Sequence, residues 1–162
     1  MIAIGFDPGT ARLGYGVIES EPDPRPVDYG VIVTDHDLPM AERLLVIHDA
    51  VIELIDRYEP GAVAVELLFF ARNVTTAMTV GQARGVILLA AAQRAVPVAE
   101  YAPSEVKQAV VGYGKADKRQ IQEMVRIMLG LDDLPRPDDA ADALAVAICH
   151  VQVAPFRSRV GV

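Results

Sequence analysis

The chain has a single cysteine, Cys149, so an internal disulfide framework is excluded, and no cluster of residues resembles a site for a soft metal. Long hydrophobic runs are missing too. The longest uncharged apolar stretch, residues 85–92, is too short to cross a bilayer and ends before Gln93 and Arg94. No basic segment precedes the first apolar run, so we expect no signal peptide and a cytoplasmic protein. Internal repeats, low-complexity blocks and inter-domain linkers are also absent from the sequence.

The composition is that of a globular protein. Of the 162 residues, 52% are hydrophobic, which is enough for one domain with a substantial core. We expect a single domain over residues 1–153 and a mobile C-terminal tail over residues 154–162.

The net charge of −7 is unusual for a nucleic-acid-binding protein, which normally presents a basic surface. The charge is unevenly distributed, however. Residues 1–60 contain twelve acids and four arginines, a net −8, whereas residues 61–162 contain ten acids and eleven basic residues, a net +1. The basic cluster of the second part comprises Lys107, Lys115, Lys118, Arg119 and Arg126. An ordinary solvated helix face explains this cluster as well as a DNA-binding face does.

Four acidic residues stand in apolar surroundings. Asp7 and Glu66 each end an apolar run, and Asp139 and Asp142 begin an apolar, helix-like stretch. A carboxylate at the end of a buried strand is costly unless a cation meets it, and several carboxylates that converge can hold Mg²⁺ or Mn²⁺. We therefore interpret the chain as a metal-dependent nuclease.

Any one of these acids could instead be a loop residue or a helix cap. Asp7 is the stronger candidate because Pro8-Gly9-Thr10 predicts a tight turn at the strand end. Asp139 and Asp142 are three residues apart, so a helix places them on one face, where a bound cation would relieve their repulsion. The neighbouring Asp138 follows a proline at the helix start and is better explained as a cap or as a partner of the helix dipole.

Hydrophobic periodicity predicts an α/β protein in which three antiparallel strands precede strands joined by helical crossovers. The expected strands span residues 2–7, 14–19, 27–34, 62–66 and 96–101, and the expected helices span residues 39–58, 73–95, 103–111, 117–129 and 138–153. The result is a five-stranded mixed sheet with helices on both faces. Short strands with acids at their ends fit the ribonuclease-H-like architecture.

Several motifs, in order and spacing, resemble the RuvC family of Holliday-junction resolvases. They are Phe6-Asp7-Pro8-Gly9-Thr10, Gly14-Tyr15-Gly16, Val65-Glu66, Gly81-Gln82-Ala83-Arg84-Gly85, Val106-Lys107-Gln108 and Asp139-Ala140-Ala141-Asp142-Ala143-Leu144-Ala145. The resemblance implies a homodimeric, Mg²⁺-dependent endonuclease that nicks two opposed strands of four-way junction DNA symmetrically. It also implies two ions per site, with Mn²⁺ as a substitute, and cooperation with the RuvA-RuvB branch-migration helicase complex.

The resemblance assigns roles to particular residues. Asp7, Glu66, Asp139 and Asp142 match the family's four catalytic acids. Phe69 matches an aromatic residue in a loop near the active site, where it could stack on unpaired bases, although both Phe69 and Phe70 could be core residues. Lys107 and Lys118 match positions that meet the DNA backbone near the cut. Lys115 and Arg119 are weaker candidates for the same contact.

Other residues leave more than one interpretation open. Gly81 and Gly85 lie on one helix face, which could pack closely against the sheet or, as in the family, form a dimer interface. His150 lies roughly 12 Å along a helix from Asp142, too far to ligate the same ion, and Cys149 is expected to be a small core residue.

Two other functional classes deserve comparison. A phosphotransferase of the actin and sugar-kinase type also reads Asp-x-Gly-Thr after its first strand, but it needs two such domains and this chain is too short. A YqgF-like nuclease or a non-catalytic junction-binding module is the remaining alternative, against which the complete set of four acids argues.

Overall fold

The computed structural model describes residues 1–67 and 73–161. The strands are β1 (Ile2–Asp7), β2 (Arg12–Glu19), β3 (Arg25–Val33), β4 (Ala62–Glu66) and β5 (Val98–Tyr101). The helices are α1 (Met40–Tyr58), α2 (Val74–Gln93), α3 (Pro103–Val111), α4 (Lys118–Met128) and α5 (Asp138–Val160). Each element expected from the sequence is present, and all ends except that of α5 lie within two residues of the prediction.

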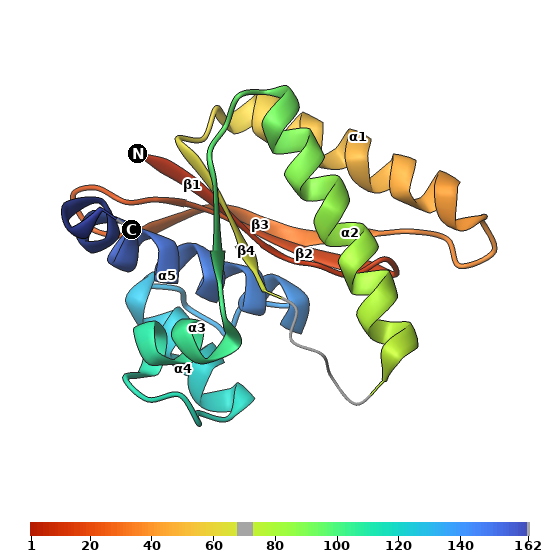
Figure 1. Cartoon of the computed structure of the whole chain (residues 1–162). Helices are drawn as coiled ribbons and strands as arrows, with labels where there is room; N and C mark the ends of the chain where they lie inside the picture. The colour runs from red at the N-terminus through yellow and green to blue at the C-terminus, as the bar shows by residue number, and fades with distance from the viewer. Residues whose placement is uncertain (68–72, 162) are drawn as a thin grey trace.

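The strands form one mixed sheet in the order β3-β2-β1-β4-β5. β2 is antiparallel to both β1 and β3, whereas β4 is parallel to both β1 and β5. Short connections join the antiparallel strands, and the parallel strands are reached through α1 and α2, as crossover geometry requires. Figure 1 shows α1 and α2 on one face of this sheet and α3, α4 and α5 on the other, as predicted.

Two hydrophobic cores lie on opposite faces of the sheet because successive strand residues point in opposite directions. In β1, Ile4 and Phe6 pack with residues of α1 and α2, whereas Ala3 packs with residues of α5. This alternation puts Gly5 and Asp7 on the same face as Ala3. The first of the predicted catalytic acids therefore lies on the α5 side of the sheet.

The predicted end of the last helix at residue 153 is wrong, because residues 154–160 continue α5 rather than form a tail. Contacts with β5 and α3 hold this extension in place. The guanidinium of Arg157 lies 4.5 Å from the ring centroid of Tyr101 in β5 and is bonded to the Glu105 carboxylate at 2.7 Å. About two turns earlier in α5, Nδ1 of the buried His150 lies 2.9 Å from the Tyr101 hydroxyl. These contacts stabilise α5 beyond residue 153, where the hydrophobic periodicity ends.

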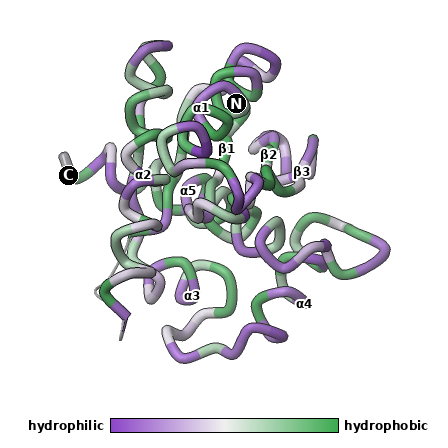
Figure 2. The backbone as a smooth tube through the Cα atoms, turned by 90° about the vertical axis from the view of Figure 1, so that its right-hand side faces the viewer, coloured by the Kyte–Doolittle hydropathy of each residue, from purple (hydrophilic) through white to green (hydrophobic). Residues whose placement is uncertain are grey.

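Two helices, α2 and α5, are long and apolar enough to cross a membrane by length and composition alone. This is weak evidence, because buried core helices pass the same test. Figure 2 shows α5 near the centre of the molecule, between the sheet and the pair α3 and α4. α2 is less covered, and Val74, Met78 and Leu89 on it are more than half exposed.

Candidate active site

Asp7 and Glu66 lie at one edge of the sheet. They are the last residues of β1 and β4, which are parallel neighbours. Phe6 pairs with Val65, so the next residue of each strand leaves the sheet beside the other. Both acids are partly buried. The parallel pairing thus brings together two carboxylates that are far apart in the sequence.

Helix α5 lies directly on this part of the sheet because the strands carry glycine where the helix crosses them. A Cβ atom added to Gly14 would lie 2.0 Å from the carbonyl oxygen of Asp139, and one added to Gly5 would lie 2.3 Å from that of Ala143. Any side chain at these positions would push the helix away. The close contact places the first turns of α5, with Asp139 and Asp142, over the ends of β1 and β4.

The four acids interact electrostatically. Burial raises the pKa of Asp7 to about 8 from its ordinary 3.8, and neighbouring carboxylates add to the increase. These neighbours are, in order of effect, Asp142, Glu66 and Asp139. Burial and the charge of Asp142 also raise the pKa of Glu66. The sequence therefore identified four acids that the fold does bring together, and their mutual repulsion favours a cation among them.

The donor set suits a hard divalent cation, because it consists of carboxylate oxygens alone. The four acids are not the tightest acidic group in the described ranges, however. Asp35, His36 and Asp37 have ligand atoms within 4.8 Å of one another, but all three are exposed on a surface turn, where such groups are common without an ion. Cationic side chains already neutralise part of the charge of the more widely spaced four acids.

Lys118 is one of these cations. Its Nζ atom lies 3.5 Å from Oδ2 of Asp142 and 3.5 Å from Oδ2 of Asp138. Partial burial opposes the charged form of Lys118, but the two carboxylates, Asp142 first, outweigh it and raise the pKa of the lysine. Lys107 lies across a pocket of about 370 Å³ that is also lined by Glu66, Asp142 and Lys118. Two of the predicted DNA-contacting lysines therefore flank the acids.

The other predicted DNA contacts are placed differently. Lys115 is exposed in the connection between α3 and α4. Arg119 lines a separate pocket with Val111 and Met124, away from the acids. Phe69 and Phe70 fall outside the described residues, so their roles stay predictions.

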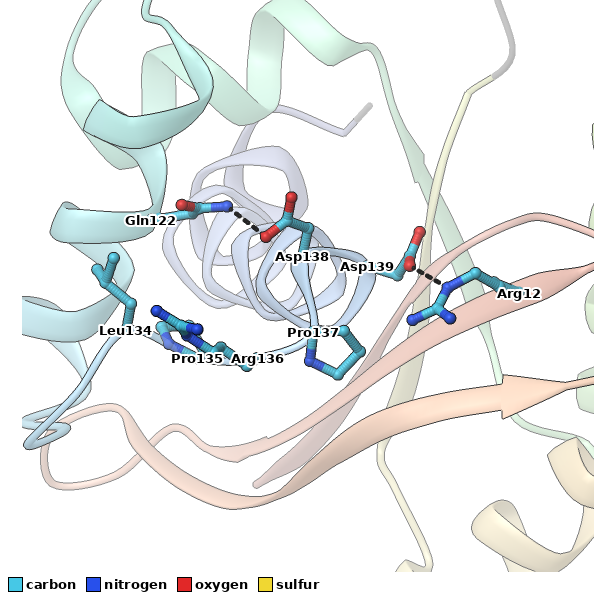
Figure 3. Close-up of a pocket in the computed structure, with 8 residues that line it drawn as sticks. All are labelled: Arg12, Gln122, Leu134, Pro135, Arg136, Pro137, Asp138 and Asp139. Atoms are coloured by element: carbon cyan, nitrogen blue, oxygen red, sulfur yellow. Dashed lines mark hydrogen bonds and ion pairs between the residues drawn. The ribbon is translucent and has the colours of Figure 1, made fainter.

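Arg12 is a site residue that sequence reasoning missed. Its Nε donates a hydrogen bond of 2.9 Å to Oδ2 of Asp139, as Figure 3 shows. The position could have been found from strand alternation, because Arg12 is two residues from Gly14 on β2 and so shares its face. Gly14 in turn pairs with Asp7.

Asp138 is not a helix cap. The N-cap position of α5 is Pro137, and Asp138 is the first helical residue, where its charge complements the helix dipole. Its exposed carboxylate accepts a hydrogen bond of 3.1 Å from Nε2 of Gln122 and pairs with Lys118 (Figure 3 shows the bond to Gln122). Asp138 thus ties α4 to the start of α5. Cys149 is fully buried, which confirms it as a core residue.

Comparison with known proteins matches this architecture to one family. The family model of the crossover junction endodeoxyribonuclease RuvC matches residues 3–150. A crossover junction endodeoxyribonuclease RuvC from Roseiflexus sp. (strain RS-1) is 58% identical over 158 residues, which cover 97% of this chain and 94% of the relative. The chain belongs to the RuvC family. The family resemblance found in the motifs is thereby confirmed.

Solved RuvC structures agree. The structure of Thermus thermophilus RuvC is 42% identical and superposes with a TM-score of 0.88, with 99% of this chain and 97% of that chain covered. A second structure, of T. thermophilus RuvC in complex with Holliday junction substrate, gives a TM-score of 0.89 at 42% identity and covers 99% and 96% of the two chains. The predicted ribonuclease-H-like fold is confirmed. The prediction of an endonuclease is confirmed as well, because the relatives are crossover junction endodeoxyribonucleases, and the RuvC family is metal-dependent.

Proposed function

We propose that this RuvC-family protein resolves four-way (Holliday) DNA junctions in recombination and repair, by symmetric nicks in two opposed strands. A single nuclease domain carries the activity. The observation that carries the proposal is the convergence of Asp7, Glu66, Asp139 and Asp142 from β1, β4 and α5 at one edge of the sheet. A junction-binding module without catalysis would have no use for four mutually repelling, partly buried acids.

Asp7, Glu66, Asp139 and Asp142 would hold the metal, for which Mg²⁺ is the proposed ion and Mn²⁺ a substitute, with two ions per site. Bound there, the metal would supply an activated water and charge neutralisation at the scissile phosphate. The support is the donor set itself, in which oxygen ligands and an excess of negative charge match a hard dication.

Lys107 and Lys118 would contact the DNA backbone beside the cut. The support for this role is their position in the pocket that Glu66 and Asp142 also line. Lys115 and Arg119 are further candidates, but they lie outside this pocket and would meet DNA at a greater distance from the cut. Phe69 would stack on bases at the branch point.

Symmetric scission requires two sites, and we infer that a second copy of the chain packs against α2. Met78, Gln82, Gly85 and Leu89 form an exposed stripe with helical spacing along this helix. A Cβ atom at Gly85 would meet nothing within 4 Å, so packing inside the chain does not require glycine there. Close approach of a partner helix does explain it. A twofold dimer would then present two active sites to opposed strands.

The dimer can be tested by light scattering after size-exclusion chromatography. Leu89→Glu places a charge in the proposed interface and should convert the dimer to a monomer. Ile127→Glu is the matched control, because Ile127 is equally exposed but lies on α4. A dimeric Leu89→Glu variant would place the interface elsewhere.

A cytoplasmic location and cooperation with the RuvA-RuvB helicase complex complete the proposal on the strength of family membership. The decisive assay compares cleavage of a labelled synthetic four-way junction with that of a linear duplex, with and without Mg²⁺. Junction-specific, metal-dependent and paired nicks are expected, and Glu66→Gln should abolish them while junction binding persists. Cleavage of both DNAs at equal rates, or junction binding without cleavage, would refute the proposal.

A further inference from the structure

Arg12 occupies one of the two carboxylate oxygens of Asp139, a proposed metal ligand. Its Nε lies 2.9 Å from Oδ2 of Asp139, and the two side chains are 50% and 32% exposed. The residues come from β2 and the first turn of α5, 127 positions apart in the sequence. The contact therefore forms only when α5 is packed against β2.

This ion pair is exchangeable. A pair that is half exposed gains little from Coulomb attraction because water screens it. A divalent ion at the same carboxylate has twice the charge and several carboxylate ligands. The ion would also repel the guanidinium of Arg12, since two positive charges would then lie at the same carboxylate. Metal binding and the Arg12–Asp139 contact thus compete.

Once displaced from Asp139, the Arg12 side chain could bind a DNA phosphate. Arg12 lines a pocket of about 730 Å³ that opens beside Asp139 and is also bordered by Arg136 (Figure 3). A guanidinium at the rim of a nuclease site can bind a phosphate through two parallel hydrogen bonds. Because Arg12 contacts Asp139, a DNA strand bound at the acids would lie close to this rim.

We propose that Arg12 is the counter-ion of Asp139 in the metal-free protein, that a divalent ion displaces it, and that the released guanidinium then contacts a DNA phosphate. Metal binding and junction binding are thereby coupled through one side chain. The inference rests on the proposed role of Asp139 in holding the metal. It makes Arg12 a DNA-binding residue whose availability depends on the metal.

The first test is calorimetric titration of the DNA-free protein with Mn²⁺. Arg12→Gln should bind Mn²⁺ roughly three- to tenfold more tightly than the wild type, because a competing positive charge is gone. Arg12→Lys should behave like the wild type or lie between the two. Arg25→Gln is the control, because Arg25 forms a similar exposed pair with Glu19 on the same sheet, and it should leave Mn²⁺ affinity unchanged. Unchanged or weaker Mn²⁺ binding by Arg12→Gln would overturn the inference.

The second test measures the salt dependence of junction binding with Ca²⁺ or with EDTA, with the junction checked for integrity on a gel. In the wild type, the slope of log K against log salt should be steeper with Ca²⁺ by about 0.9, the value for one added phosphate contact. Arg12→Gln should show no such difference. An equal slope in both conditions for the wild type would overturn the coupling. Failure of the wild type to bind Mn²⁺, or binding unaffected by Asp139→Asn, would instead refute the proposed metal site.

Discussion

Asp7→Asn tests whether the protein sacrifices stability to keep a charge in its active site. Asparagine preserves the shape of the side chain and removes the charge. In the wild type, the folded-state pKa of Asp7 is about 8, whereas its ordinary value is 3.8. Between these values the folded protein holds a proton that the unfolded chain has lost. The contribution of Asp7 to stability is therefore complete below pH 3.8 and is lost as the pH rises through 8.

The magnitude follows from the linkage relation. A difference of one pKa unit corresponds to about 1.4 kcal/mol, so a group with a folded-state pKa near 8 lowers the free energy of unfolding by about 2 kcal/mol between pH 6 and pH 8. Burial and like charge raise the pKa of Glu66 and Asp142 as well, and both act in the same direction. Asp7→Asn should remove most, but not all, of the dependence on pH.

The assay is urea unfolding in EDTA at pH 6 and pH 8, followed by circular dichroism, with m-values compared to confirm that the same transition is observed. At pH 8 the variant should be more stable than the wild type, although it should not cleave junctions. Asp37→Asn is the control, because the side chain of Asp37 is 82% exposed, and it should keep the wild-type pH dependence. An Asp7→Asn variant that loses as much stability as the wild type between the two pH values would refute the argument.

Three further predictions concern the assembly of the site. Gly14→Ala should displace α5 by more than 1 Å, because its Cβ atom would lie only 2.0 Å from the carbonyl oxygen of Asp139. We expect the free energy of unfolding, measured in urea, to fall by about 1–3 kcal/mol and the rate of single-turnover cleavage to fall by about 10²-fold. Wild-type cleavage by this variant would show that the close contact is dispensable. Lys107→Ala and Lys118→Ala should each weaken cleavage and reduce the slope of log K for junction binding against log salt by about 0.9. An unchanged slope would show that neither lysine contacts a DNA phosphate. Asp138→Asn should keep most activity, since the amide oxygen still accepts from α4, whereas Asp139→Asn should lose nearly all cleavage while it still binds junctions. The reverse result would place the catalytic motif one residue away from its assignment.

Much of the site could be predicted because each acid interrupts a local apolar pattern. Asp7 and Glu66 end strands that are recognisable from hydrophobicity alone, and Asp139 and Asp142 share a helix face by spacing. The family resemblance then selected Asp139 over Asp138. Local patterns were sufficient here because the relevant information lies within a few residues of each acid.

Contacts between distant segments could not be predicted in the same way. The bond between Arg12 and Asp139 joins residues 127 positions apart and depends on how closely α5 approaches the sheet. Lys118 and Arg119 are adjacent in the sequence, but successive helix positions point in different directions, and only the packing of α4 decides which one faces the acids. The extension of α5 past residue 153 likewise depends on Arg157 reaching Tyr101 and Glu105.

The order of the site's parts along the chain has a consequence for protein synthesis. The ribosome makes β1 first and α5 last, and domains fold as units once their segments are available. Until α5 has emerged and docked on the glycines of β1 and β2, Asp7 has neither Asp139 nor Asp142 beside it. A nascent or truncated chain that lacks α5 therefore has only Asp7 and Glu66 of the four proposed catalytic acids, and we expect it not to cut DNA. The proposed active site is complete only when α5 is in place.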